Sequence, residues 1–236
     1  LQKLESLSIS ECPITDDFFP VISLVANSIQ YVDLYKNSTL FNMVLSGDFR
    51  VLQTIRFTYT STSYELPTFN GTFPMLSVLD LTSNDHSFMS SSQKLENLTS
   101  LEYLYLNYNG FSVIPNMTQQ LKTLKLIDVE GNPIWRLNRA EMKMIDGLNV
   151  RLRDTQNLYY LAPICFTKPT TLSLSGSHLD LCACKNFWLK READKGVLDL
   201  YVSYVRCGDS DKFWYQMTQY EFLQVCRGSQ QQREWR

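Results

Sequence analysis

Apolar residues recur along this chain in one spacing pattern. The pattern is apolar-x-x-apolar-x-apolar-x-x followed by asparagine or another small or polar residue, and Leu101, Leu104, Leu106 and Asn109 form its clearest copy. Eight copies begin at Leu4, Ile29, Leu52, Leu76, Leu101, Leu124, Ile145 and Pro169. Successive copies start 21 to 25 residues apart, and a constant period in this range is typical of repeats that stack into a solenoid.

Alternation inside each copy predicts a short β-strand. Successive side chains of a strand point to opposite faces, so Leu104 and Leu106 should point inward while Tyr103 and Tyr105 point outward. A single repeat cannot bury its apolar face alone, so neighbouring repeats must stack. We expect the recurring asparagine to be buried, with its amide satisfying backbone groups where the chain leaves the strand.

Some copies depart from the pattern. Cys12, Thr60 and Ser177 occupy the asparagine position in three of them, as small residues can. The seventh copy is the poorest: Ile145, Leu148 and Val150 supply its apolar residues, and Arg153 falls at the asparagine position.

Residues 1–181 resemble the leucine-rich-repeat family through these copies. The resemblance implies an α/β solenoid, a horseshoe with a parallel β-sheet on its concave side. The first copy begins almost at Leu1, and we expect this chain to be the C-terminal part of a longer solenoid; the alternative is an unusual start.

Four of the six cysteines crowd the last quarter of the chain, at Cys182, Cys184, Cys207 and Cys226. Spacing alone leaves three disulfide pairings open, and a four-cysteine zinc site is the rival interpretation, although Cys-x-Cys suits zinc poorly. With the aromatic residues at 187–188, residues 182–226 resemble the cysteine-rich cap of extracellular leucine-rich-repeat domains, which implies the pairs Cys182–Cys207 and Cys184–Cys226. Residues 227–236 form a polar tail.

The other two cysteines, Cys12 and Cys165, lie six repeats apart. At about 5 Å per stacked strand they are beyond disulfide reach of each other. We expect two buried thiols; the alternative is a bond to an upstream segment or to another chain.

Composition and motifs argue against several functions. With 22 basic and 24 acidic residues and no basic stripe, the chain is not expected to bind nucleic acid. No apolar run is long enough to cross a bilayer. With only two histidines and no catalytic, phosphate-binding or metal-binding pattern, we expect no enzymatic activity, no cofactor and no metal.

The outward positions of the second to sixth strands are rich in tyrosine and charge, whereas the first and eighth copies present serine and threonine. Tyrosine and arginine are enriched in interface hot spots, although tyrosine is also simply a good strand residue. The candidate partner-binding residues are Tyr31, Asp33, Tyr35, Arg56, Asp80, Tyr103, Tyr105, Tyr108, Asp128 and Glu130. We expect the contact to centre on Tyr103, Tyr105 and Arg56, near Asp80.

Disulfides imply an oxidising compartment, and four glycosylation sequons agree with an extracellular protein. Asn37 falls at the buried asparagine position and should stay unmodified, whereas Asn70, Asn97 and Asn116 fall between strands and are candidates for glycans.

The period and the cap together resemble Toll-like receptor ectodomains. This resemblance implies an extracellular or cell-surface ectodomain that recognises a protein ligand or co-receptor, and it allows a dimer. Cell-adhesion and guidance receptors share both features, and a matrix-organising protein is a structural alternative.

Overall fold

The computed structural model describes residues 3–15, 17–36, 44–60, 67–84, 95–116, 121–208 and 210–233, the last six by their backbone alone. These residues form two compact units, Leu1–Pro133 and Ile134–Arg236. Each unit is described separately below.

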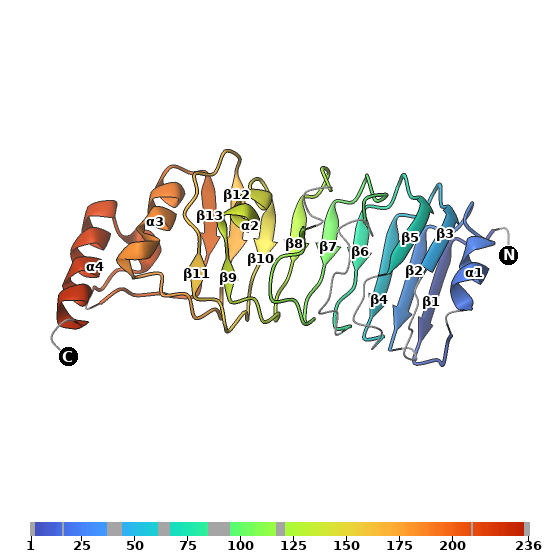
Figure 1. Cartoon of the computed structure of the whole chain (residues 1–236), viewed down its shortest axis with the longest axis horizontal. Coiled ribbons are helices and arrows are strands. Elements are labelled where there is room, and N and C mark those ends of the chain that lie inside the picture. The colour runs from blue at the N-terminus through green and yellow to red at the C-terminus, as the bar shows by residue number, and fades with distance from the viewer. Residues whose placement is uncertain are drawn as a thin grey trace. The chain divides into compact units, whose positions relative to one another are not determined.

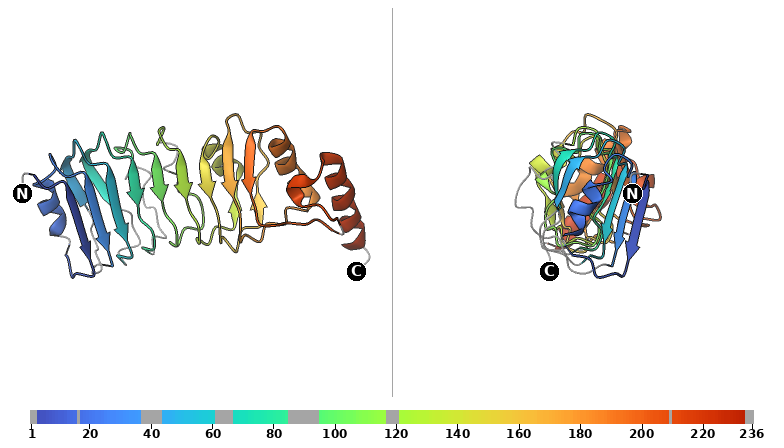
Figure 2. Two further views of the ribbon diagram at one scale, coloured as in Figure 1. Left: turned by 180° about the vertical axis from the view of Figure 1, so that it is seen from behind. Right: turned by 90° about the vertical axis from the view of Figure 1, so that its right-hand side faces the viewer.

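The first unit is built on six parallel strands that pair in chain order (Figure 1). The strands are β1 (Ser6–Ser10), β2 (Tyr31–Tyr35), β4 (Thr54–Thr58), β6 (Val78–Asp80), β7 (Tyr103–Tyr105) and β8 (Leu126–Asp128). The left view of Figure 2 shows the same succession from behind, running from blue to yellow-green. Parallel order with one strand per period is what stacked repeats require.

Strand register follows the apolar pattern of the sequence. Leu104 pairs with Leu79 of one neighbouring strand and with Ile127 of the other, and all three side chains are fully buried. Tyr103 and Tyr105 flank Leu104 and are only half-buried, which confirms the predicted alternation. Burying one such leucine contributes about 1.5–3 kcal/mol, so a slip of one residue would expose the whole apolar row.

A second layer covers the other side of the buried row in the first unit. It contains the short helix α1 (Phe18–Ser23) and the paired parallel strands β3 (Val44–Asp48) and β5 (Thr68–Thr72). The Ser23 hydroxyl donates a 2.6 Å hydrogen bond to the Ser46 carbonyl, which ties α1 to β3. The apolar core lies between the two layers, where aromatic rings such as Phe19 and Phe57 meet edge to face.

Each of the eight copies leaves its strand through a residue with left-handed backbone, four positions after the second apolar residue of the copy. These residues are Glu11, Lys36, Tyr59, Ser83, Tyr108, Gly131, Asp154 and Gly176, with φ between 49° and 78°. For a residue other than glycine this conformation costs about 1–2 kcal/mol. In this conformation the backbone N–H of the residue can bond to the next repeat. The N–H of Tyr108, for example, donates to the Glu130 carbonyl at 2.8 Å.

Directly after the left-handed residue comes the predicted asparagine ladder. Asn84 Oδ1 accepts from the backbone N–H of Thr60 at 2.8 Å, and Asn109 Oδ1 accepts from the N–H of Asn84 at 3.1 Å. Asn132 Oδ1 accepts from the N–H of Phe111 at 3.1 Å. All three amide side chains are buried and donate to backbone carbonyls, which confirms their expected role.

The ladder should therefore carry a measurable share of the first unit's stability. Asn109 Nδ2 donates to the carbonyls of Leu81, Leu106 and Asn107 at 3.0 Å each. The variant Asn109→Ala leaves these buried groups without their partner and should lower the free energy of unfolding by about 2–4 kcal/mol. Urea unfolding measures the change. The exposed Asn27→Ala is the control, and an equal loss in both variants would contradict a special role for the ladder.

The second unit contains three paired parallel strands, β10 (Asn149–Arg151), β12 (Thr170–Ser173) and β13 (Leu198–Tyr201). Two further short strands, β9 (Arg136–Leu137) and β11 (Tyr160–Leu161), pair with each other. The helical elements are α2 (Arg139–Met144), the 3-10 turn η2 (Cys184–Asn186), α3 (Phe187–Asp194), the 3-10 turn η3 (Trp214–Gln216) and α4 (Gln219–Arg233). The helix α2 begins with a capping box, in which Asn138 and Glu141 bond each other's backbone N–H groups.

The predicted register of the seventh copy is wrong by two residues. Val150 pairs with Leu172 of the eighth copy, so the seventh copy runs Gly147, Val150, Leu152 and Thr155. Thr155 is fully buried, and its hydroxyl donates to the Leu152 carbonyl at 2.6 Å. Threonine thus takes the ladder position that the sequence pattern had given to Arg153.

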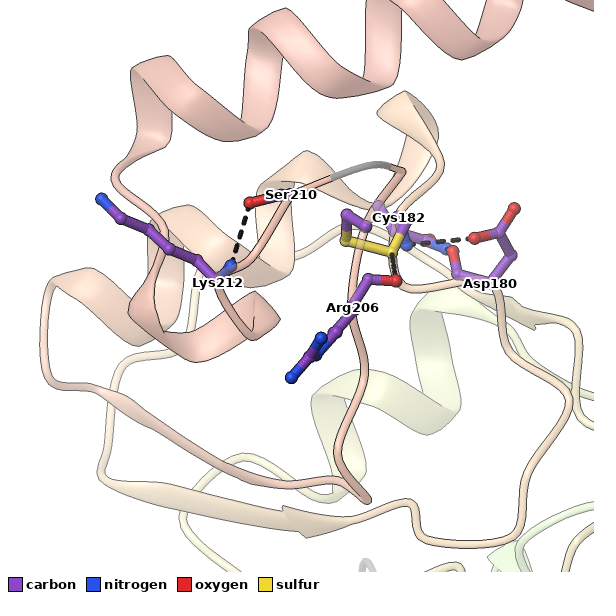
Figure 3. The surroundings of a disulfide bond; sticks show 7 residues. Asp180, Cys182, Arg206, Ser210 and Lys212 are labelled. Carbon is purple, nitrogen blue, oxygen red and sulfur yellow. Dashed lines mark hydrogen bonds between the residues drawn. A yellow bond between two sulfur atoms is a disulfide. The ribbon is translucent and has the colours of Figure 1, made fainter.

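Two disulfides join Cys182 to Cys207 and Cys184 to Cys226, the pairs that the cap resemblance implies. Figure 3 shows the surroundings of Cys182, whose backbone N–H donates to the Asp180 carboxylate at 3.0 Å. Because all four thiols are consumed, the rival zinc interpretation is excluded. The domain boundaries proposed at 181/182 and 226/227 stay a prediction. The strand β13 lies inside the segment expected to be cap, yet it pairs with the last predicted repeat.

A small core lies around the disulfides, in which Trp188, Trp214 and Phe222 are buried. Glu192 is buried beside it and accepts from Lys195 Nζ at 2.8 Å and from Arg191 Nε at 3.2 Å. Burial disfavours the ionised carboxylate, but the bonds from Lys195 and Arg191 outweigh it and hold the pKa of Glu192 below its ordinary value.

Cys12 and Cys165 are both exposed, so the expectation of buried thiols is wrong. Cys12 follows β1, which among the described strands pairs with β2 alone. The inward side chains of β1, Leu7 and Ile9, are only half-buried. Cys165 lies in the irregular stretch between β11 and β12 and is exposed there.

The stability of the second unit should depend strongly on the disulfide that closes its longer loop, Cys184–Cys226. Replacing Cys184 and Cys226 together by alanine opens a loop of 42 residues and should cost about 2–5 kcal/mol. Thermal unfolding under non-reducing conditions measures this loss. The exposed thiol variant Cys165→Ala is the control and should unfold like the parent protein. A double variant as stable as that control would refute the stapling role.

Candidate protein-binding surface

The outward side chains of β2, β4, β6 and β7 form the candidate surface, called the tyrosine face below. It comprises Tyr31, Asp33, Tyr35, Arg56, Asp80, Tyr103, Tyr105 and Tyr108. Each residue stands on a strand or on the turn that ends it, and the buried leucine row fixes the backbone behind it. Sites on rigid elements hold their side chains more closely than sites on loops.

Register brings the centre of the predicted contact together. Arg56 pairs with Asp80, and Asp80 pairs with Tyr105, on three consecutive strands. At about 4.8 Å between strands, these residues span roughly 10 Å. Tyr103 stands beside Tyr105 on the same strand, separated by the buried Leu104. A cation, a carboxylate and two phenol rings thus share one small surface.

The Asp80 side chain is held by its own strand end. Its Oδ1 accepts from the Thr82 backbone N–H at 3.1 Å and from the Thr82 hydroxyl at 2.6 Å. A carboxylate fixed in this way presents its charge in one place.

A second aromatic cluster lies at the β2 side of the tyrosine face. Tyr35 packs edge to face on Tyr59 with ring centroids 5.6 Å apart, and Lys36 Nζ lies 5.3 Å from the Tyr35 ring centroid. Tyr35 and then Glu11 favour the protonated amine, so the pKa of Lys36 is raised above its ordinary value. Tyr59 belongs to this cluster through its left-handed turn and was not among the predicted site residues.

Arg56 also contacts Tyr31 of the neighbouring strand β2. Its guanidinium donates to the Tyr31 hydroxyl at 3.2 Å and lies 5.8 Å from the centroid of that ring. The Tyr31 hydroxyl in turn donates to Asp33 Oδ2 at 3.2 Å. Tyr31 and Tyr103 share one row of the sheet but are separated by Thr54 and Val78. The tyrosines of β2 and those of β7 are therefore separated by the strands β4 and β6.

Asp128 does not belong to the surface. The whole of β8 is buried, and Asp128 is 2% exposed. Its Oδ1 turns along the chain to accept from the Glu130 backbone N–H at 3.2 Å. This prediction is wrong because alternation fixes which face a side chain leaves from but not whether its neighbours cover it. Glu130 stays at the edge of the surface, where it accepts from the Tyr108 hydroxyl at 2.8 Å.

Tyr108 needs the glycine that follows in the next repeat. A Cβ atom at Gly131 would lie 2.3 Å from the Tyr108 ring. The tyrosine ring therefore occupies the space that a side chain on the neighbouring turn would fill, while remaining 49% exposed.

Comparison with known proteins agrees with the repeat pattern. Residues 100–121, which contain β7, match the model of the Leucine Rich Repeat family. Residues 100–121 are a leucine-rich repeat. A curated relative, chaoptin of Tribolium castaneum, is 36% identical over 62 residues. That match covers 25% of this chain and 8% of chaoptin, so the chain corresponds to a small part of chaoptin's length.

Leucine-rich repeats generally serve protein–protein recognition, so the coarse prediction of a protein-binding chain agrees with this match. Among the helices that the structure describes, none combines the length and the apolar character of a bilayer span. Within the same residues, no three His, Cys, Asp or Glu side chains come together as a metal site.

The fit between Tyr108 and Gly131 can be tested by adding one methyl group. Gly131→Ala forces a left-handed alanine into the Tyr108 ring and should cost about 2–4 kcal/mol, of which the backbone accounts for about 1–2. Gly196 is the matched control because it has φ of 73° and a Cβ atom added there would meet no other atom within 4 Å. Gly196→Ala should therefore lose the backbone part alone in urea unfolding. If the two alanine variants lose equal stability, the Tyr108 ring does not occupy that space.

Proposed function

We propose that this protein is an extracellular recognition ectodomain that binds a protein partner through its tyrosine face. The observation that supports this most is the register of Arg56, Asp80 and Tyr105 on consecutive strands. Tyrosine and arginine are enriched in binding hot spots, and tyrosine buries a large area with few rotatable bonds to freeze. The two disulfides agree with an oxidising, extracellular compartment.

Within that class, we propose a receptor of the Toll-like kind. The support is the repeat period of about two dozen residues together with the paired cysteines that follow the last repeat. The alternatives are a cell-adhesion or guidance receptor and a matrix-organising protein, and the identity of the captured partner separates them. A soluble ligand or co-receptor favours the first proposal, a receptor on an opposing cell favours the second, and a fibrous protein favours the third.

Glycans are proposed at Asn70, Asn97 and Asn116, all of which are exposed. Asn70 lies within β5 rather than between strands as expected, and β5 is not part of the tyrosine face. The remaining sequon residue, Asn37, lies outside the described residues. A glycan at Asn70 would therefore leave the tyrosine face accessible.

Removing two tyrosines tests the proposed function. The protein is first used as bait on extracellular fluid and cell-surface extract, and the affinity of the captured partner is then measured by surface plasmon resonance. Tyr103→Ala/Tyr105→Ala should weaken binding by about a hundredfold or more, since hot-spot residues contribute about 2 kcal/mol or more each. Circular dichroism should show an unchanged fold, because both side chains leave the strand away from the core.

The matched control is Tyr204→Ala/Tyr220→Ala, which removes two exposed tyrosines of the second unit. That variant should bind the partner as the parent protein does. Unchanged binding by the Tyr103/Tyr105 variant, or an equal loss in the control, would contradict binding through the tyrosine face.

A further inference from the structure

One carboxylate of the tyrosine face has no cation beside it. Asp80 stands on β6 and is half-buried. Its Oδ1 accepts both hydrogen bonds from Thr82, whereas its Oδ2 accepts none, and no ion pair reaches it from the residues that the structure describes. A partly desolvated carboxylate has lost hydration that only an opposite charge replaces well. Asp80 is therefore a place where a cation from outside would be stabilised.

Arg56 does not supply that cation, although it pairs with Asp80 in the register. Its guanidinium turns to the other neighbouring strand, β2, where it donates to the Tyr31 hydroxyl at 3.2 Å and lies 5.8 Å from the centroid of that ring. Asp80 stands on β6, on the opposite side of β4. The positive charge of this row is thus held away from Asp80.

The neighbouring carboxylates of the face are bonded by tyrosine hydroxyls. Asp33 Oδ2 accepts from Tyr31 at 3.2 Å, and Glu130 Oε1 accepts from Tyr108 at 2.8 Å. Asp80 has Tyr105 as its register partner on β7, yet no hydrogen bond joins the two side chains within the described residues. Asp80 therefore differs from both neighbours in having one oxygen to spare.

A second acceptor without a donor lies two residues beyond Tyr105. Asn107 follows the buried Leu106, so alternation places it on the outward side of the chain, where it is half-buried. Its Oδ1 is buried and accepts no hydrogen bond from the described residues. Such orphaned acceptors are rare in folded proteins. Rotation about the last side-chain torsion, which has a broad minimum, would turn this oxygen toward a ligand.

Asn107 belongs to the same small surface as Asp80. Its backbone carbonyl accepts from the N–H of Ser83 at 2.9 Å, so it stands beside the turn that follows β6. The half-buried rings of Tyr103 and Tyr105 complete the surface. Two acceptors without donors next to two aromatic rings favour a ligand that is cationic and has donors only.

Among side chains, arginine fits this set of groups best. A guanidinium has five N–H donors and no acceptor, its planar fork serves two oxygens, and its plane stacks on aromatic rings. The lysine ammonium is a compact, strongly hydrated point charge and lacks the plane and the fork. Charge complementarity and shape therefore agree on a guanidinium.

We propose that the tyrosine face binds an arginine side chain of its protein partner at Asp80. Asp80 Oδ2 and Asn107 Oδ1 accept from the guanidinium, and the rings of Tyr103 and Tyr105 pack against its plane. This inference rests on the proposed function for the partner and adds the chemistry of the residue that the partner presents.

The probe is a fluorescent hexaarginine peptide, and the readout is fluorescence anisotropy with the whole chain at physiological ionic strength. Exposed charges more than about 8 Å apart are largely screened there. Hexaarginine should bind, and hexacitrulline, which has the same shape without the charge, should not. Hexalysine should bind at least about threefold more weakly than hexaarginine. Absence of hexaarginine binding, or equal binding of hexalysine, overturns the proposal.

The variant Asp80→Asn keeps an oxygen for Thr82 and removes the charge. It should weaken hexaarginine binding about tenfold or more, the equivalent of one charged hydrogen bond. The matched control Asp17→Asn removes the same charge from an exposed position outside the tyrosine face and should change binding by less than about twofold. An equal loss in both variants reports general attraction to acidic residues and overturns the site.

A second variant keeps the test decisive if Asp80→Asn disturbs the strand end. Tyr105→Leu retains both acceptors and an apolar side chain but removes the ring, so hexaarginine binding should weaken about threefold. The control Tyr204→Leu removes an exposed tyrosine of the second unit and should bind hexaarginine like the parent protein. If Asp80→Asn and Tyr105→Leu both bind like the parent protein, the proposal is overturned.

The captured partner separates this inference from the proposed function. Partner binding that is lost in Tyr103→Ala/Tyr105→Ala but unchanged in Asp80→Asn supports the tyrosine face and overturns the arginine contact. Partner binding that survives the double tyrosine variant overturns the proposed function, and the hexaarginine measurements then still decide the arginine site by themselves.

Discussion

The structure depends on how each repeat leaves its strand. The chain must turn sharply enough to return for the next repeat, yet the backbone groups of that turn lie against the apolar core. A left-handed residue makes the turn, and the next residue satisfies the buried backbone, as Tyr108 and Asn109 do after β7. A polar group buried without a partner costs about 1–3 kcal/mol, as much as the burial of one leucine contributes.

This constraint also determines the surface. Because every turn holds its strand in the same register, residues one position either side of the buried centre fall into straight rows across the sheet. Arg56, Asp80 and Tyr105 meet for this reason in the first unit, and Arg151, Ser173 and Tyr201 meet for the same reason in the second. The turn positions themselves carry variable side chains, and two of them, Tyr59 and Tyr108, extend the aromatic surface beyond the strands.

The sequence predicts the repeats well where the period and the apolar residues agree on one register, as they do from Leu52 to Leu124. It fails in the seventh copy, where Gly147 stands at the first apolar position and the nearby Ile145 and Leu148 offer a false alternative. The strand β13 was not predicted, because its residue Leu200 follows its partner Leu172 by 28 residues, which is longer than the repeat period. Coverage of a side chain by its neighbours, as at Asp128, depends on contacts that periodicity does not contain.

Hydrogen–deuterium exchange of individual amides tests the ladder most directly. The N–H groups of Thr60, Asn84 and Phe111 each donate to an asparagine side chain of the following repeat rather than to a backbone carbonyl. These three amides should exchange only through cooperative unfolding of the first unit, as slowly as the amides of its paired strands. Exchange at the rate of solvent-exposed turn amides would contradict it.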